Sequence, residues 1–134
     1  MNNRYLLDTN ILSDLMRSPA GRVAARIAEI GEQQICTSII VVAELRYGIA
    51  RNRSRRLSAQ LVVILRGLEV VPFEPPADVT YAELRAGLER RGHPIGGNDL
   101  LIAAHALALD RILVSANERE FSRIPDLRIE NWLR

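Results

Sequence analysis

Short runs of consecutive apolar residues alternate along the chain with longer stretches whose apolar residues recur at helical spacing. The short runs predict strands buried on both faces of a parallel sheet, at Arg4–Asp8, Gln34–Thr37, Glu69–Phe73 and Ile112–Ser115, with a last edge strand at Leu127–Glu130. The helical spacing predicts helices at Ile11–Met16, Arg22–Ile30, Ser38 to about Arg51, Leu57–Leu68, Ala77–Arg90 and Asn98 to about Leu109. This alternation predicts an α/β fold, a three-layer α/β/α sandwich around a central, mainly parallel sheet.

Polar residues at the junctions predict where the helices start. Thr9 or Asn10 can cap the first helix, Ser38 the long central one, and Asn98 the helix that follows a Gly/Pro-rich turn. We find no linker or repeat in the 134 residues and therefore expect a single domain over residues 1–134.

Three acids interrupt apolar stretches, namely Asp8, Glu44 and Asp99. An unpaired ionised side chain buried in such a stretch would cost several kcal/mol, so each must face solvent, a cation or a phosphate. Ligands of parallel sheets collect beyond the carboxyl ends of the strands. Asp8 lies at this edge, and the helices that carry Glu44 and Asp99 begin after loops that can lie at the same edge. If the fold brings the three together, they form an acidic pocket suited to Mg²⁺ or Mn²⁺ rather than zinc.

Each acid taken singly has a simpler explanation. Asp99 follows Asn98 at a helix start, where an acid is commonly a dipole partner. For Glu44 the simpler explanation would be a salt bridge to a nearby arginine of the same helix. Helical geometry does not favour one, because Arg46 lies on another face of the helix and Arg51 is about two turns away.

Several polar residues could support such a pocket. The side-chain oxygens of Thr9, Asn10, Ser115 and Asn117 could orient a carboxylate or a bound water. The two histidines are expected to be structural, because His93 lies in a turn and His105 lies off the helix face of Asp99.

Composition narrows the class of protein. With 48% hydrophobic and 25% charged residues the chain is neither disordered nor a coiled coil. It has no apolar run of the roughly 18 residues that a membrane span needs, and we expect a cytoplasmic protein. The single cysteine, Cys36, is expected to be a buried structural thiol.

All 18 basic residues are arginine, and five of them, with no acid among them, cluster at Arg46, Arg51, Arg53, Arg55 and Arg56. Arginine forks match phosphate oxygens, so this cluster suits a nucleic-acid substrate. A GC-rich genome would explain the arginine usage, and a solvated helix end would explain the cluster.

The motifs together resemble a known family. In chain order they are Leu7-Asp8-Thr9-Asn10, Ala43-Glu44-Leu45 followed by Gly48, Gly96-Gly97-Asn98-Asp99 with Leu101 to Ala106, Asn117 with Glu120-Phe121, and Arg128 to Trp132. This ordered set, from Tyr5 to Trp132, resembles PIN-domain ribonucleases of the VapC toxin type.

The resemblance implies a Mg²⁺-dependent endoribonuclease toxin, held inactive by a VapB-type antitoxin, as a homodimer or a toxin–antitoxin hetero-oligomer. Its substrates would be structured RNAs such as initiator tRNA. Asp8 and Asp99 would be metal ligands and Glu44 a ligand or water-orienting base. The family's fourth acidic position falls at Asn117, which leaves open whether Asn117 or Glu120 serves there and whether one or two ions bind.

Two other functions fit parts of the sequence. Haloacid-dehalogenase-type phosphatases also place an aspartate after the first strand, but they need a second one where this chain has Asn10, and a lysine, which is absent. A PIN-like RNA- or protein-binding module without catalysis is the non-enzymatic alternative. Apolar residues between Arg46 and Leu68 are candidates for a partner surface.

Overall fold

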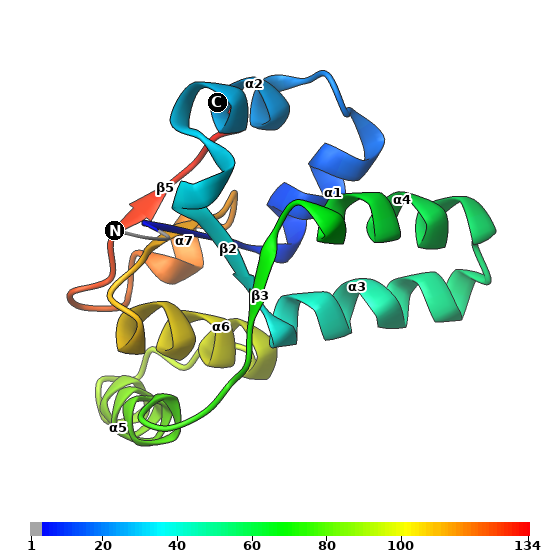
Figure 1. The fold of residues 1–134 in the computed structure, drawn as a ribbon. Coiled ribbons are helices and arrows are strands. Elements are labelled where there is room, and N and C mark those ends of the chain that lie inside the picture. The colour runs from blue at the N-terminus through cyan, green and yellow to red at the C-terminus, as the bar shows by residue number, and fades with distance from the viewer. Residues whose placement is uncertain (1–3) are drawn as a thin grey trace.

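Five parallel strands form the centre of the protein, in the order β3-β2-β1-β4-β5. The computed structural model describes residues 4–134 (Figure 1). The strands are β1 (Tyr5–Leu7), β2 (Ile35–Ser38), β3 (Glu69–Val71), β4 (Ile112–Val114) and β5 (Ile129–Glu130). Four of them lie within the predicted segments, and β2 runs one residue past its predicted end, to Ser38. Their pairing confirms the predicted parallel sheet.

Helices cover both faces of this sheet and confirm the three-layer α/β/α sandwich. They are α1 (Thr9–Arg17), α2 (Arg22–Ile30), α3 (Ile39–Asn52), α4 (Arg55–Arg66), α5 (Ala77–Arg90), α6 (Gly97–Ala108) and the short α7 (Glu118–Phe121), with a 3₁₀ turn at Glu32–Gln34. In Figure 1, α1, α2 and α4 lie on one side of the strands, and α5 and α6 lie on the other. Helices α3 and α4 form a hairpin that extends away from the sheet (Figure 1).

The middle of the sheet explains why its strands are continuously apolar. Leu6 and Leu7 of β1 and Leu113 and Val114 of β4 have no exposed surface, because helices cover both faces of these strands. Cys36 of β2 is equally buried, as predicted, and burial raises the pKa of its thiol to about 11. The core therefore fixes the positions at which β1 and β4 end.

Two predicted helix caps are wrong. The cap of α1 is Asp8, whose Oδ1 accepts the Thr9 N–H at 2.7 Å, so neither Thr9 nor Asn10 caps this helix. The cap of α6 is Gly96 without a side-chain bond, because the Asn98 amide is used elsewhere. Ser38 caps α3 as predicted, with its Oγ accepting the Ile40 N–H at 3.0 Å.

The α4 boundary also differs from the expected one. Ser54 accepts the Leu57 N–H at 3.1 Å, so the helix begins at Arg55 and ends before Leu68. The last residues of the chain pack back on the first strand, where the rings of Tyr5 and Trp132 lie 5.3 Å apart.

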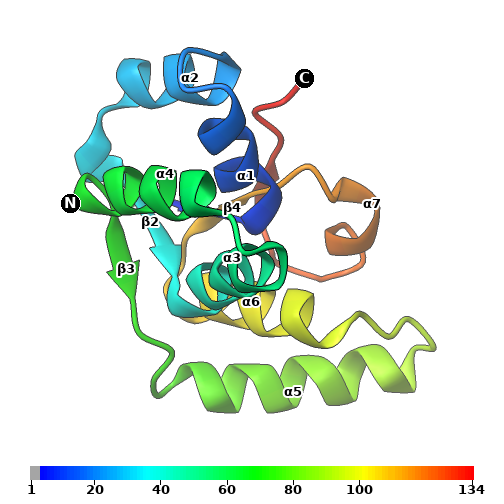
Figure 2. The ribbon, with the colours of Figure 1, turned by 90° about the vertical axis from the view of Figure 1, so that its right-hand side faces the viewer.

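Figure 2 shows the end of the sheet at which β1 and β4 lead into helices. The start of α1, the side of α3, the start of α6 and the short α7 surround this end. Among the described helices, none combines the length and the apolar character needed to cross a membrane.

Candidate active site

Asp8 directly follows β1 and is almost fully buried, with 3% of its surface exposed. Its Oδ2 accepts the Ser115 hydroxyl at 2.7 Å, while its Oδ1 accepts the Thr9 backbone N–H. Burial raises the pKa of Asp8, the two hydrogen bonds lower it, and the Glu44 carboxylate raises it again. The fold thus holds a carboxyl group whose ionised form is disfavoured by burial, in one orientation, at the carboxyl edge of the sheet.

Glu44 projects from the side of α3 towards the starts of two other helices. Its Oε1 accepts the Thr9 hydroxyl of α1, and its Oε2 accepts the Asn98 amide of α6 at 2.9 Å. Asn98 therefore joins α6 to α3 in place of the predicted capping role.

Asp99 lies half-buried in the first turn of α6, where its Oδ2 accepts the Asn117 amide at 3.1 Å. Its pKa is raised to about 7, first by burial and then by the Glu120 carboxyl and the charges of Asp8 and Glu44. Glu120 also accepts the Gly96 N–H at 3.4 Å. The two candidates for the fourth acidic position, Asn117 and Glu120, thus both lie beside Asp99.

One hollow of about 490 Å³ at the edge of the sheet contains the three carboxylates and Asn117, whereas Glu120 does not line it. It is lined by Asp8, Thr9, Asn10, Ser13, Arg17, Glu44, Asp99 and Asn117. Ser115 lies behind Asp8, and its Oγ accepts the Asn117 N–H at 3.0 Å. Asn10 accepts the Ala116 N–H at 3.1 Å and so ties the loop after β4 to α1.

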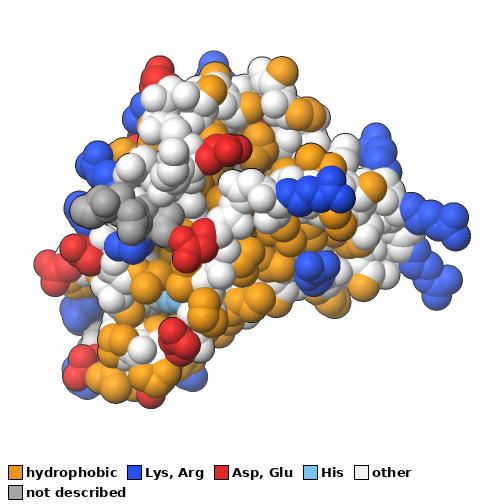
Figure 3. All heavy atoms as spheres, viewed as in Figure 1, with side chains coloured by type: hydrophobic (Ala, Val, Ile, Leu, Met, Phe, Trp, Pro, Cys, Tyr) orange, Lys and Arg blue, Asp and Glu red, His pale blue; other side chains and the backbone are white. Residues whose placement is uncertain are grey.

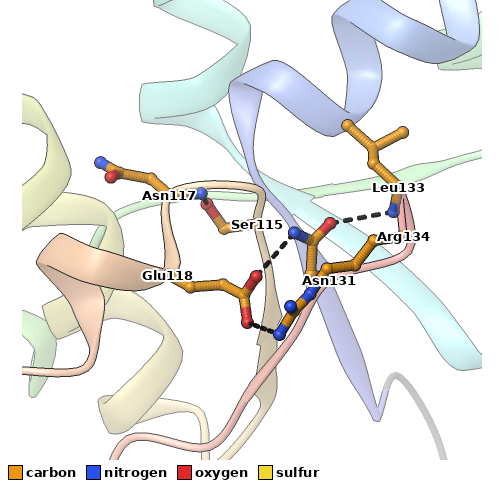
Figure 4. A network of polar contacts seen from close by, with 6 residues as sticks. All are labelled: Ser115, Asn117, Glu118, Asn131, Leu133 and Arg134. Carbon is orange, nitrogen blue, oxygen red and sulfur yellow. Dashed lines mark hydrogen bonds and ion pairs between the residues drawn. The ribbon is translucent and has the colours of Figure 1, made fainter.

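The segment that carries Asn117 is held from its other side by the end of the chain. In Figure 4 the Asn117 side chain points away from Glu118, which faces Asn131 and Arg134. Glu118 accepts from the Asn131 amide at 2.9 Å and from the Arg134 guanidinium at 2.8 Å. The contacts of Glu118 thus fasten the start of α7 beside the hollow.

Comparison with known proteins gives the family. A model described as "PIN domain" matches residues 5–127. The chain belongs to the PIN-domain family. The "Ribonuclease VapC2" of Rickettsia felis is 38% identical over 130 residues, which cover 96% of this chain and 97% of that protein. The "tRNA(fMet)-specific endonuclease VapC" of Salmonella typhimurium is 32% identical, with coverage of 96% and 98%.

Solved structures agree with the sequence comparison. VapBC2 from Rickettsia felis, bound to a DNA fragment from its promoter, matches with a TM-score of 0.87 and 38% identity, covering 96% of this chain and 98% of that one. DNA-bound VapBC from Salmonella typhimurium matches with a TM-score of 0.86 and 32% identity, covering 97% and 98%. The resemblance to VapC-type PIN domains is therefore confirmed.

The donor set of this PIN domain suits a hard divalent cation. Within residues 4–134, no group of three Asp, Glu, His or Cys side chains is close enough together to hold a metal ion by itself. The hollow nevertheless presents carboxylate, amide and hydroxyl oxygens, the ligands that Mg²⁺ and Mn²⁺ prefer. No ion pair within the described part of the chain joins Asp8, Glu44 or Asp99 to an arginine, which leaves their mutual repulsion for a cation to relieve.

The predicted RNA-contact arginines lie outside this hollow. Arg46, Arg51 and Arg53 are exposed on α3 and the turn after it, and none of them lines the acidic hollow. Figure 3 shows basic side chains around the outer end of the α3–α4 hairpin.

The arginine that does line the hollow is Arg17, which the sequence analysis missed together with Ser13. Asn10, Ser13 and Arg17 follow the i, i+3, i+7 spacing of one helix face, and this signal could have identified them.

The two histidines of the PIN domain lie outside the hollow. His105 is buried, and its Nδ1 lies 2.8 Å from the Ser38 Oγ, so it links α6 to the start of α3. His93 is exposed in the turn after α5. Neither histidine lines the hollow that contains the carboxylates.

Proposed function

We propose that this PIN domain is a VapC-type endoribonuclease toxin that hydrolyses phosphodiester bonds in RNA at the hollow lined by Asp8, Glu44 and Asp99. The observation that supports this most is the gathering of three carboxylates, from three separate segments of the sequence, into one oxygen-lined hollow without an ion pair to an arginine. The relatives named ribonuclease VapC favour the same function.

In this proposal Asp8 and Asp99 bind a divalent cation, which is Mg²⁺ or, as a substitute, Mn²⁺. Glu44 is a further ligand or the base that orients water. When bound, the cation supplies an activated water and neutralises the charge on the leaving oxygen. The protein's own part is orientation. Ser115 fixes the Asp8 carboxylate, Thr9 fixes Glu44, and Asn117 fixes Asp99.

The proposed substrate is a structured RNA, with initiator tRNA as the first candidate because the Salmonella relative is named for tRNA(fMet). The proposed partner is a VapB-type antitoxin, in line with the VapBC complexes among the similar structures. We expect the toxin to act in the cytoplasm, as a homodimer or in a hetero-oligomer with the antitoxin.

An apolar hollow of about 440 Å³ between α1, α2 and α4 is the surface proposed for the antitoxin. Leu12, Ile27 and Ile64 line it, and Val63 at its edge is 64% exposed. An amphipathic segment of the antitoxin would bury such a surface favourably.

The test is cleavage of initiator tRNA by the purified protein with Mg²⁺, with EDTA, and in the Asp8→Asn variant. We expect cleavage with Mg²⁺ alone, and a loss of more than about 100-fold in Asp8→Asn, since removing a ligand costs at least as much as removing a residue that supports one. The matched control is Asp78→Asn, which makes the same change at an exposed acid in the first turn of α5, outside the hollow.

Full cleavage by Asp8→Asn would refute the catalytic assignment. If the unaltered protein binds RNA but does not cleave it with either Mg²⁺ or Mn²⁺, the protein is instead a non-catalytic binding module. In both cases circular dichroism must show that the variants remain folded.

A further inference from the structure

Arg17 is the last residue of α1, and its side chain reaches the hollow that contains the carboxylates. This side chain is 65% exposed, and its only ion pair among residues 4–134 is with Asp14 at 4.0 Å. An exposed pair at that distance contributes little to stability. The guanidinium is therefore available to an incoming anion.

An arginine beside several acids would ordinarily neutralise one of them, but here the acids have other partners. Glu44 accepts from Thr9 and Asn98, and Asp99 accepts from Asn117. Arg17 thus leaves the negative charge of the site in place and adds a separate positive charge at its edge.

Such an arrangement suits a polyanion that must approach carboxylates. A cation held by the acids can neutralise the phosphate that is cut, but the neighbouring phosphates of the strand would still be repelled. A guanidinium presents paired N–H donors that match two phosphate oxygens. Ser13, one turn earlier on the same face of α1, also lines the hollow and adds a hydroxyl donor.

We propose that Arg17, with Ser13 beside it, forms a binding subsite for an RNA backbone phosphate that flanks the cleaved bond. This inference rests on the proposed function, since it assumes that the acidic hollow receives RNA. The exposed arginines of the α3–α4 hairpin, outside the hollow, would then contact only more distant parts of the RNA.

The first test measures RNA binding in an Asp8→Asn background, with a labelled, mixed-sequence oligoribonucleotide over a range of salt concentrations. Arg17→Ala should raise the Kd roughly tenfold, as expected for a lost hydrogen bond to a charged group. It should also reduce the slope of log K against log salt by about 0.7, the contribution of one phosphate contact to a single strand. Arg17→Lys should keep the slope, because it keeps the charge.

The control is Arg66→Ala, which removes the same charge from an exposed residue at the end of α4. Arg66 precedes β3 and so lies at the opposite edge of the sheet from the carboxylates. Equal Kd values and slopes for Arg17→Ala and Arg66→Ala would overturn the proposal.

The second test measures cleavage of initiator tRNA in the otherwise unaltered protein. Arg17→Ala should raise KM by roughly the same factor and leave kcat unchanged, because a flanking phosphate is bound equally in the ground and transition states. A fall in kcat at constant KM would overturn the proposal. So would weakened binding of a VapB-type antitoxin with unchanged RNA affinity, which would assign Arg17 to the protein partner.

The two proposals can fail separately. If the unaltered protein does not cleave RNA, the proposed catalysis fails, whereas the salt slope still decides whether Arg17 binds a phosphate.

Discussion

The hydroxyl of Thr9 donates a hydrogen bond to Glu44 Oε1 and so joins the first turn of α1 to the side of α3. The two residues are 35 positions apart in the sequence, and Glu44 also accepts from Asn98 of α6. The orientation of Glu44 therefore depends on two short polar side chains from two other helices.

Thr9→Val should disturb the orientation of the Glu44 carboxylate without unfolding the protein. Valine keeps the shape of threonine but cannot donate, so we expect RNA cleavage to fall about tenfold while the protein stays folded. Thr9→Ser keeps the hydroxyl and should retain most of the activity. Initial cleavage rates and thermal melting provide the measurement, and a wild-type rate in Thr9→Val would show that Glu44 needs no help from Thr9.

Asn117→Asp should make the fold more dependent on a divalent cation. The amide of Asn117 donates to Asp99, so a carboxylate in its place would repel Asp99 and lower the Tm of the metal-free protein. Added Mg²⁺ should then raise the Tm by more than it does in the unaltered protein, because binding to the folded state stabilises it.

Asn131→Asp is a matched control for that experiment. Asn131 donates to Glu118 at 2.9 Å in a similar geometry, but neither residue lines the hollow (Figure 4). This variant should lose stability without gaining a Mg²⁺ response. Equal responses in the two variants would argue against metal binding at Asp99.

Val63→Arg should weaken antitoxin binding and leave RNA cleavage by the free toxin unchanged. Val63 is exposed at the edge of the apolar hollow, so the arginine would place a charge where an apolar segment is proposed to dock. Val79→Arg, at a 54% exposed position on α5, is the control and should bind normally. Calorimetric titration with the antitoxin measures both, and equal affinities would exclude this surface.

His105 should make the free energy of unfolding fall as the pH drops. Its pKa is lowered from 6.5, mainly by burial, so the unfolded chain takes up a proton below that pH while the folded protein resists it. Stability from this residue is thus complete above about pH 6.5 and declines below it, by at most about 1.4 kcal/mol per pH unit.

Denaturant unfolding of the wild type and His105→Gln between about pH 5 and pH 7.5 tests this expectation. The difference between them should shrink as the pH falls, while the exposed His93→Gln should follow the wild type throughout. Asp8 and Asp99 are present in every variant, so their raised pKa values cancel in the comparison. A constant difference would show that His105 is not protonated on unfolding.

The strands could be predicted because burial on both faces leaves a continuous apolar signal, as at Leu6 and Leu113. The gathering of the acids could also be anticipated, since parallel strands end at one edge of the sheet. Helix starts were less predictable, because a side chain such as Asn98 can cap its own helix or donate across to Glu44, and only the tertiary packing selects between them.

Charge was the least predictable feature of the site. The arginine cluster from Arg46 to Arg56 stands out in the sequence but lies outside the acidic hollow. Arg17 is isolated in the sequence, and only the direction of α1 from Asp8 brings it to the hollow. Clustering of basic residues in the sequence was thus a poor guide to the charge at the site.

The strand order has a consequence for how the toxin is made. β1 lies in the middle of the sheet and pairs with β4, so the partners of Asp8 and Asp99, Ser115 and Asn117, come from near the end of the chain. A ribosome must therefore synthesise β4 and the residues that follow it before Asp8 and Asp99 can acquire these partners. We expect a nascent chain that lacks β4 to be unable to cleave RNA, because the proposed site is still incomplete.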